Sequence, residues 1–220
     1  KIMNLLKYLT FCFVLILGFA SCRKFEQEKI VARAEPFVPT NLYPIERLPA
    51  YFNRVVVLPC FHEDNDSPVL AYIDDVFSQE LAQERIFETI RMRPSDMKRN
   101  FGKERVSSSS DLPENFLRKV EEMTNANGVL FVDIHSFRPF RPISLGVRAK
   151  LVDIKTGEFM WAIDETFDAG HGSIIVGSRI FQEKSQVRAL SSKTSGSVLQ
   201  SPRVFAKYVA STSFATLPLR

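Results

Sequence analysis

The chain has 220 residues, of which 45% are hydrophobic and 25% are charged, enough for a single folded domain with an ordinary core. Its formal net charge of +4 includes Lys1 and Lys7 of a segment that we expect to be removed. The remaining 27 basic and 25 acidic residues give +2, which indicates no nucleic-acid partner. The three cysteines, Cys12, Cys22 and Cys60, are too few for a four-cysteine zinc cluster.

The first 21 residues have the layout of a signal peptide. Lys7 supplies the positive charge, residues 8–22 carry no charge, and most of residues 9–19 are Leu, Ile, Val or Phe. This apolar run is shorter than the roughly 20 residues that a membrane-spanning helix needs, and Arg23 and Lys24 end it. We therefore predict that residues 1–21 form a cleaved signal peptide and that the protein is exported.

The sequence Phe-Ala-Ser-Cys at residues 19–22 resembles the bacterial lipobox, although Phe19 stands where Leu is usual. In lipobox proteins the cysteine carries diacylglycerol and its new amine is often acylated, for example by palmitate. The resemblance implies lipid attachment at Cys22 and a membrane anchor without a spanning helix; plain secretion is the alternative. Arg23 differs from the Asp that retains enteric lipoproteins at the inner membrane, which favours the outer membrane, facing the periplasm.

Residues 22–50 have the composition of a lipidated tether that leads into a single α/β domain at residues 51–220. Residues 23–35 are charged and have no sustained apolar stripe, and four prolines then favour an extended chain. Apolar side chains in the second half of this segment indicate that it packs along the domain: Phe37, Leu42, Tyr43 and Ile45.

The first half of the domain predicts a strand, a helix and a second strand. Residues 54–58 are rich in valine, which is typical of a strand buried on both faces. Apolar residues recur at helical spacing over residues 68–85, after a good N-cap at Ser67, and residues 87–92 alternate as in a strand. Cys60 follows the first strand, where a buried thiol is expected; a catalytic nucleophile is the alternative.

A second helix is predicted after the polar loop of residues 107–110. Asp111 is its expected N-cap, and residues 125–128 end it because Asn and Gly tolerate the left-handed conformation. Its expected core face comprises Phe116, Leu117, Val120 and Met123.

Strands dominate the following part of the chain. Residues 129–137 predict a third strand, and residues 145–154 and 158–167 predict a hairpin around a Lys-Thr-Gly turn. In the first arm of the hairpin, apolar residues alternate with Gly146, Arg148 and Lys150, so one face should be dry and the other solvated.

The last part is expected to be helical in part over residues 172–190 and loop-like over residues 193–201. Ser201 then starts a final helix that ends before Leu217. The predicted fold class is α/β, a mixed sheet of about five strands with flanking helices, in the order β-α-β-α-β-β-β and then C-terminal helices.

Four segments in this order carry a resemblance to a known group of proteins. They are the Val-rich strand of residues 55–59, the helix with Phe77 and Leu81, the strand entry at residues 126–132, and the hairpin of residues 151–161 that ends in Trp. Together they resemble envelope lipoproteins with the fold shared by the curli secretion lipoprotein, the TolB amino-terminal domain and the lipoprotein activators of penicillin-binding proteins. The resemblance covers residues 54–168, although Asn127 stands where Asp is usual.

This resemblance implies a periplasmic module that binds protein without catalysis. Relatives of the curli protein form pores from amphipathic hairpins. Here the one clear hairpin carries Arg148 and Lys150, which favours an accessory or adaptor protein over a pore subunit.

Residues that could support chemistry are few. His135 and Asp133 share a strand face, where a solvated face is favoured over a metal or acid–base pair. Four acidic residues lack the spacing of a calcium loop and are expected to be solvated: Asp64, Asp66, Asp74 and Asp75. Residues 170–173 read Gly-His-Gly-Ser, a flexible turn for which phosphate binding is the weaker alternative. We expect no cofactor and no metal.

The most unusual local sequence is Phe-Arg-Pro-Phe-Arg-Pro at residues 137–142. Two prolines exclude the interior of a central strand, so this segment should be an edge or a loop. The favoured interpretation is a proline-bounded crossing whose phenylalanines cap the core. Its Phe and Arg residues are also the types that anchor interfaces, so the alternative is a contact of Arg138 and Arg141 with a partner protein or an anionic envelope polymer. The candidate residues are Phe137, Arg138, Phe140 and Arg141.

Three hypotheses follow for the function. The first is a lipid-anchored, non-enzymatic adaptor whose partners are envelope proteins. The second is a subunit of an oligomeric outer-membrane secretion channel, which would be a homo-oligomer. The third is a hydrolase that acts through Cys60.

Overall fold

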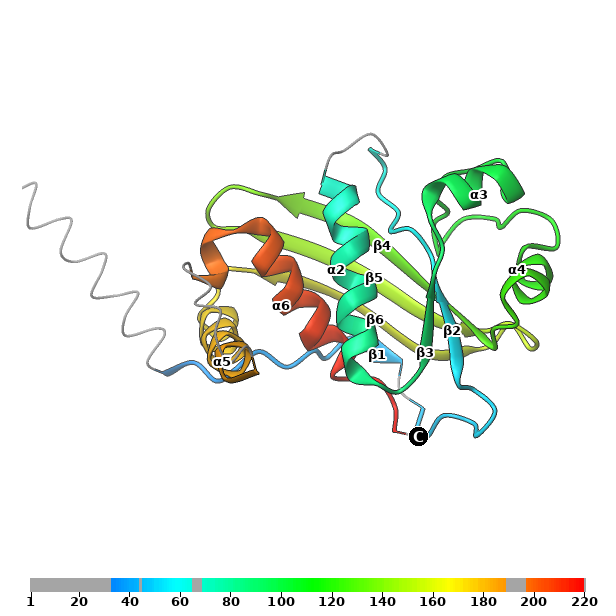
Figure 1. The fold of residues 1–220 in the computed structure, drawn as a ribbon. Helices are drawn as coiled ribbons and strands as arrows, with labels where there is room; N and C mark the ends of the chain where they lie inside the picture. Colours follow the sequence, from blue (N-terminus) through cyan, green and yellow to red (C-terminus); the bar gives the residue numbers. More distant parts are fainter. Residues whose placement is uncertain (1–32, 44, 65–68, 189–196, 220) are drawn as a thin grey trace, which may run out of the picture.

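Six strands form one mixed sheet in the order β1-β6-β5-β4-β2-β3, and helices lie against both of its faces (Figure 1). The predicted α/β fold class is therefore confirmed, with one strand more than the five expected. The computed structural model describes residues 33–43, 45–64, 69–188 and 197–219. The predicted signal peptide, Cys22, Asp66 and Ser67 lie outside the described residues.

The parallel half of the sheet is built around β2, whose three valines are buried. β2 lies between β3 and β4 and runs parallel to both, because α2 connects β2 to β3 and the segment with α3 and α4 connects β3 to β4. The elements of this half are β2 (Arg54–Val57), α2 (Val69–Glu84), β3 (Glu88–Arg91), α3 (Pro94–Phe101), α4 (Phe116–Thr124) and β4 (Gly128–Arg138).

The antiparallel half is a meander of β4, β5 (Ser144–Asp153) and β6 (Phe159–Asp168). The predicted β5–β6 hairpin is confirmed. Its turn is stabilised by Asp153, whose Oδ1 accepts the backbone N–H groups of Lys155 and Thr156 at 2.8 and 3.2 Å, and by Gly157, whose φ of 73° lies in the left-handed region.

The segment predicted as the second half of the tether runs along β6. Leu42 and Tyr43 form β1, which pairs antiparallel with β6. The N–H groups of Thr40 and Asn41 donate to Glu165 Oε1 at 2.6 and 2.8 Å, and the carbonyl of Asn41 accepts from Asp164 N at 3.1 Å. The expectation that this half packs along the domain is confirmed.

The C-terminal part supplies α5 (Gly172–Arg188), a short 3₁₀ helix (Val198–Gln200) and α6 (Pro202–Phe214). Ser201 caps α6 as expected, because its Oγ accepts the N–H of Val204 at 3.5 Å. None of the described helices is long and apolar enough to cross a bilayer.

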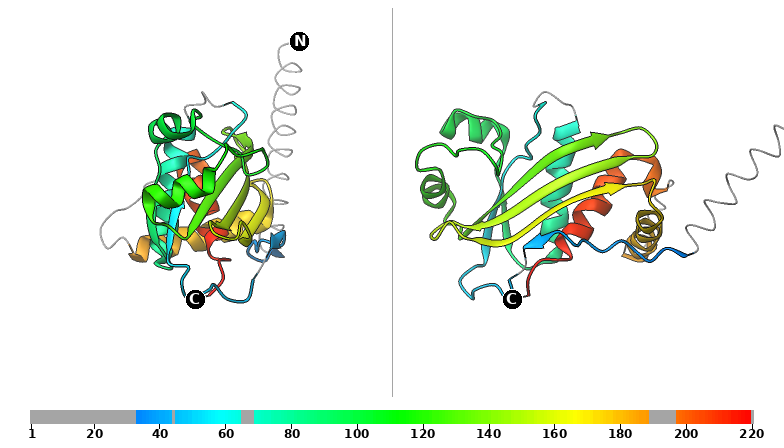
Figure 2. Two further views of the ribbon diagram at one scale, coloured as in Figure 1. Left: turned by 90° about the vertical axis from the view of Figure 1, so that its right-hand side faces the viewer. Right: turned by 180° about the vertical axis from the view of Figure 1, so that it is seen from behind.

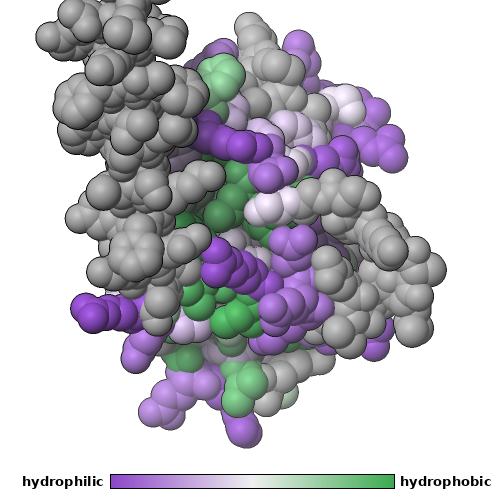
Figure 3. Space-filling model, turned by 90° about the vertical axis from the view of Figure 1, so that its left-hand side faces the viewer, coloured by the Kyte–Doolittle hydropathy of each residue, from purple (hydrophilic) through white to green (hydrophobic). Residues whose placement is uncertain are grey.

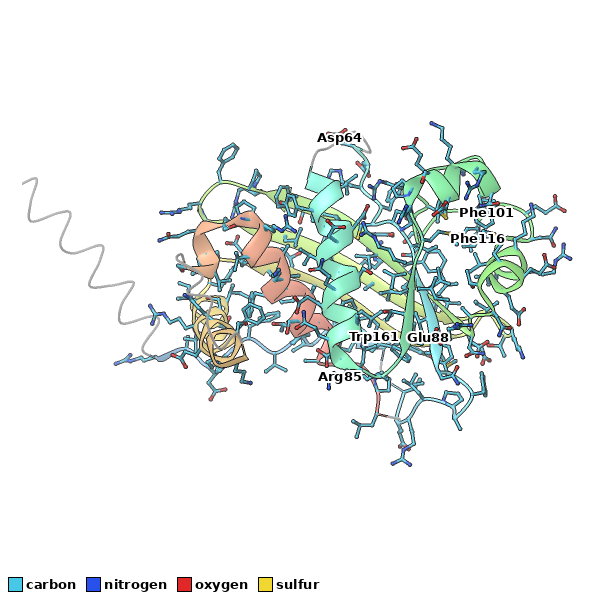
Figure 4. The ribbon with its side chains drawn as sticks, in the orientation of Figure 1. Asp64, Arg85, Glu88, Phe101, Phe116 and Trp161 are labelled. Atoms are coloured by element: carbon cyan, nitrogen blue, oxygen red, sulfur yellow. The ribbon has the colours of Figure 1, made fainter. Side chains whose placement is uncertain are left out.

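Each face of the sheet carries its own apolar core. On one face, α2 and α6 pack over the central strands, and Phe214 contacts the rings of Phe77 and Trp161 with centroids 5.8 and 6.1 Å apart. On the other face, α3 and α4 bring Phe101 against Phe116 at 4.6 Å, above Phe131 of β4 (Figure 4). Trp161 is fully buried in the larger core.

The second face is covered at one end only. Figure 2, seen from behind, shows α3 and α4 beside the β2 end, while β4, β5 and β6 run on with no described helix in front of them. We call this uncovered part of β5 and β6, together with the adjacent Tyr43, the open face. Along β5, apolar residues that point into the larger core alternate with Arg148 and Lys150, which lie on the open face. This alternation was predicted from the sequence.

Two elements were missed by the sequence analysis. β1 has two residues and owes its strand conformation to hydrogen bonding with β6, so it leaves no local pattern. α3 has eight residues, of which Met97 is the buried one, so it leaves no apolar period either, although Pro94 at its first turn was an available start signal.

The start and the core face of α4 also differ from the prediction. Asp111 is not its cap, because Asn115, with a φ of 57°, occupies the cap position and the helix begins at Phe116. Met123 is 47% exposed and not in the core, because only a narrow stripe of α4 with Phe116 and Val120 faces the sheet.

Candidate interaction surfaces

The turn between β4 and β5 presents the predicted interaction loop. Arg138 holds its base: Nε donates to the carbonyl of Pro142 at 2.7 Å, and Nη2 donates to Asp168 at 2.9 Å. Phe137 is half-buried against the larger core, whereas Phe140 is 79% exposed. Arg141, which precedes a cis proline, is also exposed. The four residues are thus close in the fold. Arg138, Phe140 and Arg141 are exposed, and Arg138 is held in place by its bonds to Pro142 and Asp168.

This turn closes a second hairpin, which the sequence analysis did not recognise. β4 pairs with β5 up to Arg138 but with β2 only at Gly128 to Leu130, so Phe137 and Arg138 have a strand neighbour on one side and both prolines lie in the turn. The expectation of an edge or a loop is confirmed.

The open face carries a cluster of paired charges. Asp164 of β6 accepts from Arg148 Nε at 2.6 Å and lies 3.2 Å from His135 Nε2. His135 lies over Gly146 of β5, where a Cβ would collide with the imidazole ring. This glycine therefore makes the room in which the histidine reaches across the sheet to Asp164.

The polar loop of Ser107 to Ser110, which we call the serine loop, is attached to this cluster. Asp133 of β4 accepts from Ser107 Oγ at 2.9 Å and from Ser108 N and Oγ at 3.0 and 2.8 Å. Lys150 Nζ donates to the Ser108 carbonyl at 2.9 Å. The prediction of a solvated strand face is wrong for Asp133, which is 5% exposed because the serine loop covers it.

A buried ion pair that the sequence analysis missed anchors the same loop from the other side. Arg105 donates to Asp74 Oδ1 and Oδ2 at 2.9 and 2.8 Å and to the carbonyl of Cys60 at 2.5 Å, and Asp74 Oδ1 also accepts from Cys60 N at 2.7 Å. The prediction that Asp74 is solvated was therefore wrong. Asp74 lies on the helical face of Leu70 and Phe77, a spacing that could have indicated its burial.

An open cavity of about 420 Å³ lies beside this pair, at the carboxyl ends of the parallel strands. Three of its four charged side chains already have partners within the fold: Lys98 donates to Glu104 at 2.8 Å, and Arg105 binds Asp74. We therefore assign no ligand to it. Its lining comprises Phe61, Lys98, Gly102, Lys103, Glu104, Arg105, Val106, Ser107 and Ser110.

Cys60 is completely buried, as the sequence predicted for a structural thiol. Burial raises the pKa of this thiol well above its ordinary value, and the nearby Asp74 carboxylate raises it further. Because the thiolate is the nucleophilic form, this environment disfavours the catalytic role considered for Cys60.

A labelling experiment tests this description of Cys60. We expect 5,5′-dithiobis(2-nitrobenzoate) at pH 8 to leave the Cys60 thiol of the native protein unmodified and to modify it at once in urea, because burial both blocks access and keeps the thiol protonated. Modification of native protein as fast as of unfolded protein would contradict the buried position.

The remaining candidates for chemistry are dispersed. His62 Nδ1 accepts from the backbone of Asp64 at 3.0 Å. His171 is exposed, and the predicted flexible turn is wrong for Gly172 and Ser173, which begin α5. Across the described ranges, no group of three or more His, Cys, Asp or Glu side chains gathers as a metal site.

Comparisons with known proteins identify no family for this chain. No protein-family model matches it, and no curated protein matches it in sequence. Among solved structures, the PelC dodecamer from Paraburkholderia phytofirmans is 14% identical with a TM-score of 0.49, over 81% of this chain and 96% of PelC.

Lipoprotein GNA1162 from Neisseria meningitidis is 12% identical with a TM-score of 0.40, over 64% of this chain and 99% of its own. The LpoB C-terminal domain from Escherichia coli is 16% identical with a TM-score of 0.37, over 52% of this chain and 82% of its own. All three TM-scores are below 0.5, so we base the function on this chain's own residues.

Proposed function

We propose that this protein is an exported lipoprotein, anchored by lipid on Cys22 at the outer membrane and facing the periplasm, which acts without catalysis as an adaptor for envelope proteins. The anchor is supported by the lipobox-like sequence at residues 19–22, directly after an uncharged apolar run. The absence of a catalytic role is supported by the burial of Cys60 and by the pairing of Asp74 and Asp133 within the fold.

The open face is the single feature that carries the adaptor role. Tyr43 and Phe159 are 54% and 45% exposed, and their rings contact each other with centroids 6.2 Å apart. Lys150 Nζ lies 5.6 Å from the centre of the Phe159 ring. Exposed aromatic side chains and arginines are enriched at protein interfaces, and Tyr and Arg are frequent among the residues that contribute most to binding.

The open face is also pre-organised. Arg148 is fixed by Asp164, and Lys150 is fixed by the serine loop, so neither side chain has to be ordered when a partner binds. Ordering a mobile side chain costs about 0.5–1.5 kcal/mol at an interface. Intramolecular bonds already hold these side chains in place, so binding of a partner does not have to order them. This favours a lasting complex over a transient one.

Photo-crosslinking in intact cells tests the adaptor role. We expect a photoreactive phenylalanine at position 159 to give a defined crosslinked product, because it conserves an exposed aromatic ring of the open face. The second change, Tyr43→Ala, removes the ring that contacts position 159 and should strongly decrease the amount of crosslinked product. The melting temperature of this variant should stay within a few degrees of that of the protein with Tyr43. Products are read by mass after purification.

The matched control places the same photoreactive residue at Leu219, which is 74% exposed but lies outside the open face. Equal products from positions 159 and 219, or a product insensitive to Tyr43→Ala, would contradict the proposal. A product with the mass of two copies of this chain would favour the second hypothesis, a subunit of an oligomeric secretion channel.

A further inference from the structure

Three segments meet at the end of the molecule where the described chain begins. The N–H of Phe37 donates to the carbonyl of Ser173 at 3.1 Å, which ties residues 36–38 to the first turn of α5. The carbonyl of Ile143 accepts from Ala169 N at 2.8 Å, and Arg138 pairs with Asp168, which together tie the β4–β5 turn to the same region. We call this region, residues 33–38, 138–143 and 168–181, the anchor end.

The anchor end exposes large apolar side chains. Phe140 and Val38 are 79% and 68% exposed. Among the large apolar side chains of the described residues, only that of Leu219, at 74%, is exposed to a similar degree. α5 adds Ile175 and Val176, which are half-buried. Where grey atoms do not cover this end, Figure 3 shows apolar groups enclosed by hydrophilic ones.

The charge of the anchor end is mainly positive. Arg141 and Arg179 are exposed, and among the described residues neither side chain has a salt-bridge partner. The exposed or half-exposed charges of this region are Arg33, Glu35, Arg138, Arg141, Asp168 and Arg179, which sum to +2. An apolar projection bordered by arginines matches the boundary between phospholipid headgroups and acyl chains.

We infer that the anchor end lies directly on an anionic phospholipid surface, with Phe140 and Val38 in the headgroup region and Arg141 against lipid phosphates. This inference rests on the proposed lipid at Cys22. Arg33 lies eleven positions after Cys22, so even a fully extended chain holds the start of the anchor end within about 40 Å of the bilayer. Because the anchor keeps the anchor end near the bilayer, the lipid surface is the ligand with the highest local concentration at this end.

Fluorescence quenching on vesicles tests the inference. The purified lipoprotein with Phe140→Cys is labelled with a fluorophore; buried Cys60 does not compete for the label. It is reconstituted into vesicles of phosphatidylcholine and phosphatidylglycerol that contain a lipid with a nitroxide near the headgroup. We expect strong quenching at position 140 and little at the control position, labelled through Leu219→Cys.

A second variant tests the charge. Arg141→Gln should weaken docking of the labelled end roughly fivefold, since one cation near an anionic surface contributes about that factor. Docking of the labelled end should be weakened at least as much on vesicles of phosphatidylcholine alone. On these vesicles Arg141→Gln should have little further effect on docking.

The possible results distinguish docking of the anchor end on the lipid surface from lipid attachment at Cys22. Protein that sediments with the vesicles but shows no more quenching at position 140 than at 219 would overturn this inference and leave the anchor intact. Such an unquenched label, combined with crosslinks from position 140 to a protein in cells, would assign the turn to a protein partner instead. Protein that fails to sediment with the vesicles would overturn the anchor and, with it, the orientation.

Discussion

Replacement of Asp74 by alanine is expected to lower the free energy of unfolding by about 3–5 kcal/mol, because it leaves the buried Arg105 guanidinium without its counter-ion. It also removes the acceptor of the Cys60 N–H. Urea unfolding measures the change, followed by the fluorescence of Trp161, which is the only tryptophan of the chain and is fully buried.

Asp75 provides the matched control for this prediction. It pairs with Arg91 at 2.5 Å, but both side chains are more than a third exposed, so Asp75→Ala should cost no more than about 1 kcal/mol. Similar losses for the two variants would contradict the importance of the buried pair. Replacing both partners by apolar residues, as in Asp74→Leu with Arg105→Met, should recover much of the loss because no buried charge then remains.

The variant Cys22→Ala is expected to abolish incorporation of labelled palmitate and to release the protein from the membrane fraction. Cys22 is the residue to which the lipobox resemblance assigns the lipid, and each buried methylene of an acyl chain contributes about 0.8 kcal/mol to membrane affinity. Fractionation of cells and autoradiography of the purified protein give the two measurements.

Cys12 serves as the control for Cys22, because it lies in the apolar run that the signal peptidase would remove. Cys12→Ala should keep both lipid and membrane location. A Cys22→Ala protein that still carries palmitate and stays with the membrane would exclude the proposed anchor.

The sequence predicted well those elements whose stability is local. The valines of β2 and the Asp153 and Gly157 turn of the β5–β6 hairpin leave short patterns that can be recognised without knowledge of the fold. The Ser201 cap of α6 is similar, since cap and helix are adjacent in the chain.

Features that depend on distant residues were not predictable in this way. β1 exists because β6 supplies its hydrogen-bond partners. Leu42 pairs with Ile163, which lies 121 positions later in the chain. The Arg105–Asp74 pair joins residues 31 positions apart, and the covering of Asp133 by Ser108 joins residues 25 positions apart.

The candidate interaction loop has one feature that its local sequence predicted and one that depends on a distant residue. Its two prolines correctly predicted an edge or a loop, but the favoured core-capping position holds for Phe137 only, since Phe140 is exposed. The pairing of Arg138 with Asp168, which gives that arginine a role in holding the turn, was hidden because Asp168 belongs to another strand.

The course of residues 37–43 along β6 determines how mechanical load enters the domain. With the proposed anchor at Cys22, a pull directed along β6 would load the hydrogen bonds of Thr40, Asn41 and the β1 pair together in shear. A perpendicular pull would instead break them one after another. In the proposed adaptor, this arrangement would resist detachment of the segment when a bound partner pulls the domain away from the membrane.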